Sequence, residues 1–253
     1  MIASRIIGHR GAAHLAPENT LAGIQMAAEC GVTWVELDTT LLGDSTPVLF
    51  HDAHLDRCTN QQGPLSALSF DALPLLDAGS WFHPEWINEP MPHLSDALRL
   101  CQELQLGLNL EIKPFDLEPD LVAERVFEQI SVYWQAPEKL IISCYNFDLL
   151  SAYKALNPQA QIGLLYDHLP ELWQLKAEML DAVSLHCDAN LITQSDVQVI
   201  KQAGYELYCY TCNYPTQAAV LFDWGVDGIF TDNPPLMRSY IPSNHLSNAF
   251  ASL

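Results

Sequence analysis

The sequence predicts a (β/α)8 TIM barrel with a small insertion after the second barrel strand. Short apolar runs alternate with helical patterns along nearly the whole chain. Most of these runs are apolar at consecutive positions, which is typical of parallel strands covered on both faces. The length of 253 residues is usual for one such barrel. No glycine-rich nucleotide-binding loop follows the first run, which disfavours the competing open doubly wound sheet.

Nine runs are candidate strands, one more than a barrel needs. The connection over residues 39–46 is too short for a crossover helix, so the run at 47–51 should pair antiparallel with the preceding one as a hairpin arm. Eight strands then remain for the barrel. The nine runs span residues 6–9, 33–38, 47–51, 108–113, 140–144, 162–166, 182–186, 206–211 and 228–231.

The intervening helices have recognisable ends. Thr20 is predicted to cap a helix, within Pro17-Glu18-Asn19-Thr20, and Gly31 to end it. Asn19 is also a second-choice candidate for ligand contact. Further on, Ser195 is predicted to cap a helix closed by Gly204, and Thr216 one closed by Gly225.

Residues 53–92 differ from this rhythm. They are rich in glycine and proline and carry Trp81, Phe82 and Trp86 close together. Such long loop-rich stretches usually lie at a binding face, so we expect a small cap over the barrel mouth. The chain 1–253 would then be one domain with 53–92 as its insertion. The polar tail at 243–253 is expected to fray.

The charge balance excludes several partner classes. Eleven basic against 31 acidic residues give a net charge of −20, which argues against nucleic acids and stable membrane association as partners. No apolar run approaches the ~20 residues of a membrane span. We expect a cytoplasmic location, since no export signal is recognisable and seven cysteines are scattered as in reduced proteins. Cys209 and Cys212 should be buried thiols, and the oligomeric state stays open.

Carboxylates concentrate at the carboxyl ends of the first strands, where barrel active sites lie. Glu36 and Asp38 are two apart in a strand and therefore face one way; Glu111 and Lys113 repeat this spacing in a later strand. Three inward carboxylates would repel one another unless a cation compensates them, and oxygen ligands favour Mg²⁺ or Ca²⁺. The alternative is a structural network in which Arg10 and Lys113 neutralise the acids.

The same strand ends carry groups suited to phosphate chemistry. Arg10 and Lys113 are two of few cations, and their place beside acids suggests an anionic ligand such as phosphate. Gly8 and Gly11 would let the backbone approach that ligand closely. His9 and His51 titrate near neutrality and suit proton transfer. His186 ends a strand and could face the pocket, whereas the other histidines are predicted surface residues, at positions 14, 54, 83, 93, 168 and 245.

Taken in order, these motifs resemble the glycerophosphodiester phosphodiesterase family, most closely its short cytoplasmic bacterial type. The resemblance covers almost the whole chain. Its two departures are Tyr210, where a tryptophan is common, and His93, where a threonine often precedes the helix. The matching motifs are Gly8-His9-Arg10-Gly11, Pro17-Glu18-Asn19-Thr20, Glu36-Leu37-Asp38, His51-Asp52, Glu111-Ile112-Lys113 and the segments 209–213 and 225–234.

The resemblance implies metal-dependent hydrolysis of glycerophosphodiesters to sn-glycerol 3-phosphate and an alcohol. It makes Glu36, Asp38 and Glu111 the ligands of one divalent cation. It also makes His9 and His51 the acid/base pair, with Arg10 and Lys113 on phosphate oxygens. Alternatives are a lysophospholipase D whose aromatic insertion receives an acyl chain, a glycosidase using paired carboxylates, and a non-catalytic phosphate-binding barrel.

Overall fold

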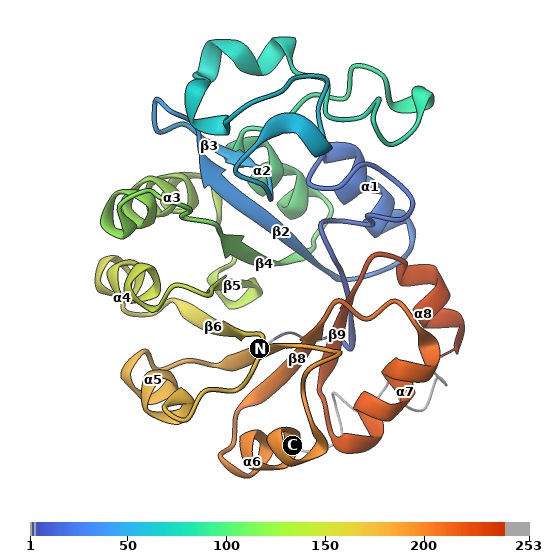
Figure 1. The fold of residues 1–253 in the computed structure, drawn as a ribbon, viewed down its shortest axis with the longest axis vertical. Coiled ribbons are helices and arrows are strands. Elements are labelled where there is room, and N and C mark those ends of the chain that lie inside the picture. The colour runs from blue at the N-terminus through green and yellow to red at the C-terminus, as the bar shows by residue number, and fades with distance from the viewer. Residues whose placement is uncertain (1, 3, 241–253) are drawn as a thin grey trace.

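The computed structural model, which describes residue 2 and residues 4–240, is a closed parallel barrel surrounded by helices (Figure 1). The sheet closes because β1 pairs with both β2 and β9. The prediction of a (β/α)8 barrel is confirmed. Its strands are β1 (Ile6–Gly8), β2 (Trp34–Leu41), β4 (Gly107–Ile112), β5 (Leu140–Cys144), β6 (Gln161–Tyr166), β7 (Ser184–Asp188), β8 (Glu206–Tyr210) and β9 (Gly228–Thr231).

The ninth strand, β3 (Pro47–Leu49), is the predicted hairpin arm. It pairs antiparallel with the end of β2, with Thr40 opposite Val48. This extra partner explains why β2 runs past the predicted end at residue 38, because residues 39–41 find their ladder bonds in β3. The last predicted strand residues at 9, 50–51, 113 and 211 fall just outside the strands, as is usual for element ends.

Helices follow the strands in the order expected. Their bounds are α1 (Leu21–Glu29), α2 (Leu94–Glu103), α3 (Pro119–Tyr133), α4 (Phe147–Leu156), α5 (Trp173–Met179), α6 (Gln194–Gln202), α7 (Pro215–Trp224) and α8 (Pro234–Tyr240). Thr20 caps α1 as predicted, accepting from the Gly23 amide at 3.0 Å.

Two predicted caps are wrong. Helix α6 is capped by Thr193, not Ser195, because Thr193 and Asp196 bond each other's backbone amides reciprocally. Helix α7 begins before Thr216, because Pro215 has a φ suited to the first helical position and needs no amide bond there. Gly225 ends α7 in the left-handed conformation, at φ 107°.

Alternation along the strands sends acids inward and apolar residues outward. In β4, Leu108, Leu110 and Ile112 pack in the core between sheet and helices, so Asn109 and Glu111 face the barrel interior. A separate interior cluster contains Ile7, Trp34, Ile141, Tyr208 and Phe230. The barrel interior therefore has one apolar layer and one acidic layer.

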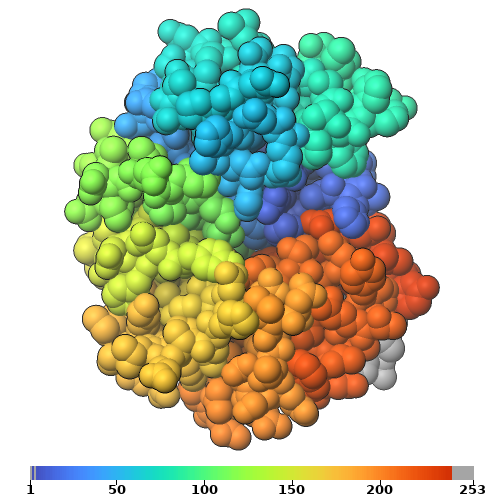
Figure 2. All heavy atoms as spheres, viewed as in Figure 1, coloured from blue at the N-terminus to red at the C-terminus, as the bar shows by residue number. Residues whose placement is uncertain are grey.

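The segment 53–92 is built from four short 3₁₀ helices around its own apolar cluster. The helices are η1 (Leu55–Arg57), η2 (Leu65–Ala67), η3 (Phe70–Leu75) and η4 (Pro84–Trp86). The cluster contains Leu42, Val48, Phe50, Leu55, Cys58, Leu65, Leu73, Leu76, Ala78 and Met91. Figures 1 and 2 show this segment, cyan to teal, gathered at one end of the molecule. The Leu49 amide donates to the Pro92 carbonyl at 3.0 Å, so both ends of the segment meet.

The predictions about membrane spans and about the cysteines concern residues that the structure largely describes. In residues 2 and 4–240, no helix combines the length and apolarity that crossing a bilayer requires. All seven cysteines are free, and Cys209 and Cys212 are buried thiols as predicted. The tail at 243–253, with His245, lies outside the described residues.

Replacing Leu110 by alanine should lower the free energy of unfolding by about 2–5 kcal/mol, because a fully buried side chain between sheet and helices leaves a cavity. Leu175→Ala in α5 is the matched control, since Leu175 is 52% exposed, and should change stability by less than about 0.5 kcal/mol. Urea unfolding of both variants measures the difference. Equal losses would contradict the assigned core.

Candidate active site

The loop after β1 carries His9 and Arg10 into the barrel mouth. Arg10 has a φ of 49°, and its amide donates to Glu36 Oε2 at 2.9 Å. The glycines around it serve chain packing: a Cβ at Gly8 would lie 2.2 Å from the Gly11 carbonyl oxygen, and one at Gly11 would lie 2.6 Å from the backbone of Gly23. The backbone is therefore closely packed at both glycines, and the close approach of backbone to a ligand stays a prediction.

Glu36, Asp38 and Glu111 come together, with one oxygen of each within 4.8 Å of the others. The β2–β4 register causes this, because Asp38 lies opposite Glu111 and Glu36 opposite Asn109. All three are buried. Asn19 fixes Asp38 by donating to Oδ2 and accepting from the Asp38 amide, both at 2.9 Å.

The side chains of Arg10 and Lys113 approach this group of acids, but they do not pair equally with all three carboxylates. Asp38 is 3.2 Å from Arg10 Nε and 3.3 Å from Lys113 Nζ. Lys113 also donates to Glu111. Glu36 receives only the Arg10 amide and lies 3.9 Å from His9 Nε2; within the described residues its buried Oε1 has no hydrogen-bond partner. In a network neutralised by Arg10 and Lys113 alone, Glu36 would therefore be the acid without a direct ion pair to either cation.

The pKa values show the same imbalance. Burial tends to raise the pKa of Asp38, but Lys113 and Arg10 outweigh it and lower that pKa to about 2. Burial, reinforced by the neighbouring carboxylates, raises the pKa of Glu36 well above its ordinary value. Burial and Asp38 raise the pKa of Glu111 to about 7. An all-oxygen donor set with excess negative charge and an unpartnered buried oxygen fits a hard divalent cation.

Each of the two predicted catalytic histidines is backed by a carboxylate. His9 Nδ1 lies 2.6 Å from Asp232 Oδ1, and His51 Nδ1 lies 2.6 Å from Asp52 Oδ1. Asn213 in turn donates to Asp232 at 2.5 Å. Because a carboxylate accepts a hydrogen bond from the Nδ1 proton, each Nε2 is left free to exchange a proton with a ligand. Burial, together with Arg10 and Lys113, lowers the pKa of His51, so its imidazole is neutral near pH 7.

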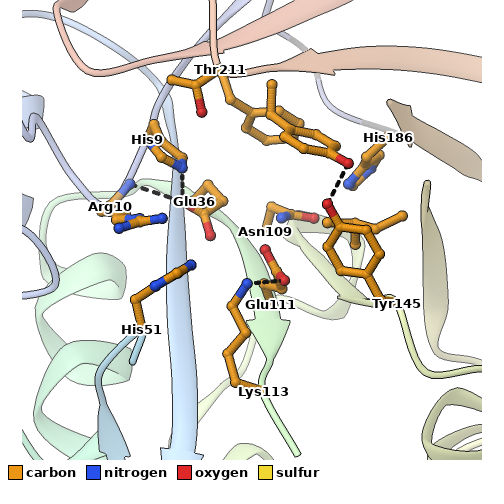
Figure 3. A pocket seen from close by; sticks show the side chains of 13 residues that line it. His9, Arg10, Glu36, His51, Asn109, Glu111, Lys113, Tyr145, His186 and Thr211 are labelled. Atoms are coloured by element: carbon orange, nitrogen blue, oxygen red, sulfur yellow. Dashed lines mark hydrogen bonds and ion pairs between the residues drawn. The ribbon is translucent and has the colours of Figure 1, made fainter. Parts of the chain in front are cut away.

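Figure 3 shows the side chains of His9, His51, Glu36, Glu111 and Lys113 around one space. This cavity has a volume of about 120 Å³, and its inner wall includes His186 and Phe230. Tyr145 and Tyr210 bond through their hydroxyls at its edge. A second cavity of about 380 Å³ shares His9 and Arg10 and is bounded by Trp81 and Phe82 from the insertion.

The remaining histidines divide as follows. His186 faces the pocket as predicted, bonds Ser184 at 2.9 Å, and burial lowers its pKa to about 3, so it is a neutral wall residue. His93 is not a surface residue: it is half-buried and caps α2 by accepting from the Ser95 amide at 3.1 Å. The other predicted surface histidines that are described are exposed, at positions 14, 54, 83 and 168.

Several residues that hold the site together could not be predicted from the sequence. Asn19 was available in the motif, but its partner Asp38 was not evident. Glu18 accepts from Arg10 Nη1 at 2.7 Å and from Arg57, a residue with no sequence signal. Tyr145 was missed because it lies one residue beyond the strand end at Cys144. Asn19 contacts Asp38, and its contact with a ligand stays a prediction.

A parallel barrel with a buried carboxylate site, two cations and two imidazole–carboxylate pairs at its mouth defines a class: barrel hydrolases of phosphate esters. Comparison with known proteins narrows the class. The profile of the glycerophosphoryl diester phosphodiesterase family matches residues 9–236. The chain belongs to this family. The resemblance and the prediction of a glycerophosphodiester phosphodiesterase enzyme are thus confirmed.

Individual relatives are similar to this chain over most of their own length. A glycerophosphodiester phosphodiesterase of Caldanaerobacter subterraneus is 33% identical over 237 residues, covering 93% of this chain and 97% of the relative. One of Bacillus subtilis is 27% identical, covering 92% and 84%. The solved structure of an Oleispira antarctica phosphodiesterase in complex with its product sn-glycerol-3-phosphate is 35% identical, with a TM-score of 0.90, covering 93% of this chain and 96% of that one.

In the metal-free protein, the contribution of Glu111 to stability should fall as pH rises from about 4.5 to about 7. The folded-state pKa of Glu111 is about 7 against an ordinary 4.5, so its protonated form favours folding. That contribution is complete below pH about 4.5 and lost as pH rises through about 7. Glu111→Gln should therefore flatten the pH dependence of urea unfolding measured with a chelator present. Glu128→Gln, at an exposed glutamate, is the control; identical pH profiles for wild type and Glu111→Gln would contradict the shift.

Proposed function

We propose that the chain hydrolyses glycerophosphodiesters to sn-glycerol 3-phosphate and an alcohol, using a carboxylate-bound divalent cation and two histidines. The observation that carries this proposal is the pairing of His9 and His51 with Asp232 and Asp52 beside the three carboxylates. The product held by the Oleispira antarctica structure at 35% identity supports the same chemistry.

Glu36, Asp38 and Glu111 would hold the cation, and their oxygens suit Mg²⁺ or Ca²⁺ rather than softer metals. When bound, such a cation offsets the negative charge that develops on phosphate oxygens. Arg10 and Lys113 lie beside the acids and line the cavity, so they would bind the phosphate oxygens and orient the phosphorus.

The two imidazoles would exchange protons on either side of the phosphorus. A neutral imidazole whose Nδ1 proton is held by a carboxylate accepts a proton at Nε2, and the resulting cation is stabilised by that carboxylate. One histidine, neutral at the start, would take the proton of the attacking hydroxyl at Nε2, and the other, entering as the imidazolium, would give its Nε2 proton to the departing alcohol. The attacker is water or the glycerol 2-hydroxyl; ³¹P spectra during turnover distinguish them, because only the latter passes through a cyclic phosphate.

A second candidate function is lysophospholipase D. Trp81 and Phe82 favour it, because they bound the larger cavity next to His9 and Arg10, where an apolar chain could lie. Comparing glycerophosphocholine with lysophosphatidylcholine separates the two functions. The proposed function is supported when the former is preferred, with glycerol 3-phosphate release measured through its dehydrogenase.

The role of residues 53–92, the cellular location and the partners are part of the same proposal. The segment 53–92 would act as a cap, since its Trp81 and Phe82 reach the mouth. A reducing, cytoplasmic location is supported by the seven free thiols. The net charge of −20 supports a small-molecule substrate without nucleic-acid or stable membrane partners.

Replacing His9 or His51 by alanine should lower turnover by about 10²–10⁴-fold, because each variant loses a proton-transfer group. His168→Ala, at an exposed histidine, is the control and should keep wild-type turnover. The measurement is the rate of glycerol 3-phosphate release. Near-wild-type turnover by either His9→Ala or His51→Ala would overturn its assigned role.

Chelation should abolish hydrolysis, and Mg²⁺ or Ca²⁺ should restore it. Added cation should also raise the melting temperature of the wild type, because it neutralises the excess acids. Glu36→Gln should lose this rise, whereas Glu128→Gln should keep it. Activity that survives exhaustive chelation would favour a glycosidase-like use of the carboxylates over the proposed function.

A further inference from the structure

The guanidinium of Arg57 joins the insertion to both sides of the active site. Its Nε and Nη2 donate to the two oxygens of Asp52 at 2.7 and 3.1 Å. Its Nη1 and Nη2 donate to the two oxygens of Glu18 at 2.7 and 2.8 Å. One side chain therefore holds two carboxylates, each by two bonds and each in a fixed orientation.

Each of these carboxylates holds a group that the proposed mechanism uses. Glu18 Oε1 also accepts from Arg10 Nη1 at 2.7 Å. Asp52 Oδ1 is the partner of His51 Nδ1 at 2.6 Å. A displacement of either carboxylate would therefore move Arg10 or turn the ring of His51.

The chain around Arg57 is firmly anchored. Leu55 and Cys58, on either side, are buried in the insertion's apolar cluster. The Thr59 amide and hydroxyl both donate to the Leu55 carbonyl, at 3.1 and 2.9 Å. The backbone that presents Arg57 is thus fixed by packing, which a positioning group requires.

The paired hydrogen bonds of Arg57 to Asp52 and Glu18 require a guanidinium group. The side chain is 45% exposed, and a simple ion pair at such a site contributes little. Two parallel bonds to each carboxylate use the planar fork of the guanidinium, which fixes direction as well as distance. A lysine ammonium is a point charge and cannot make both forks at once.

We infer that Arg57 is a positioning residue for the proposed hydrolysis, on which this inference rests. It orients His51 through Asp52 and Arg10 through Glu18. The insertion thereby contributes to catalysis through a residue that itself lines neither described cavity.

Arg57→Gln should lower kcat/KM for glycerophosphocholine by about 10–100-fold, the usual effect of losing a partner that orients an active-site ligand or base. Arg57→Lys should recover only part of that loss. Arg99→Gln is the matched control, because Arg99 is a similarly exposed arginine paired with Asp96 at 3.1 Å in α2; it should keep wild-type kinetics. Wild-type kinetics in Arg57→Gln would overturn the inference.

Double-mutant cycles separate positioning from a general structural effect. If Arg57 acts through Asp52, adding Arg57→Gln to Asp52→Asn should leave kcat unchanged. If it acts through Glu18, adding it to Glu18→Gln should leave KM unchanged. Fully additive losses in both cycles would overturn the inference, and the single variants Asp52→Asn and Glu18→Gln keep the test available should Arg57→Gln fold poorly.

A spectroscopic readout is independent of turnover. Histidine side-chain ¹H–¹⁵N spectra should place the proton of His51 on Nδ1 in the wild type and show mixed tautomers in Arg57→Gln, with His9 unchanged. Unaltered His51 signals in Arg57→Gln would overturn the inference. Absence of hydrolysis by the wild type, with the expected change at His51, would instead count against the proposed function and still support the positioning role.

Discussion

Three buried carboxylates that share only two cations are the constraint on which the rest of this site depends. The strand register brings the acids together, and burial makes their mutual repulsion costly. Both cations pair with Asp38, whereas neither Arg10 nor Lys113 forms a direct ion pair with Glu36. The uneven distribution of positive charge, more than the number of acids, makes the site suited to a cation.

The barrel interior strengthens this effect. An apolar layer that includes Trp34, Tyr208 and Phe230 lies in the interior, where side chains from several strands meet. Such a layer excludes water and lowers the local polarity, so charges nearby interact more strongly. The apolar second half of the barrel, which showed little chemistry in the sequence, therefore contributes to the electrostatics of the polar first half.

The fold could be predicted because its signals are local. Consecutive apolar residues define parallel strands, and the short 39–46 connection forces a hairpin. Cap positions were less certain, because Thr193 and Ser195 are both good caps and only the reciprocal bond with Asp196 decides between them. The acids and histidines of the site were predictable for the same local reason, since they end strands.

Partners that are distant along the chain could not be predicted, because they meet only when the whole chain has folded. Asp232 meets His9 across 223 residues of chain, and Arg57 meets Glu18 across 39. Neither pairing leaves a spacing pattern. Arg57 is the one arginine or lysine in residues 53–92, but a loop-rich stretch has no periodicity from which its partners could be predicted.

The joined ends of the 53–92 segment affect which features of this segment can vary. Because the chain leaves and re-enters the barrel at neighbouring backbone positions, Leu49 and Pro92, residues 53–92 can change in length without separating β2 from β4, which pair directly. Such a change would leave the three acids, His9 and His51 in place, but it would have to preserve the bonds that Arg57 forms with Glu18 and Asp52. The length of this segment is therefore less constrained than the position of its one arginine.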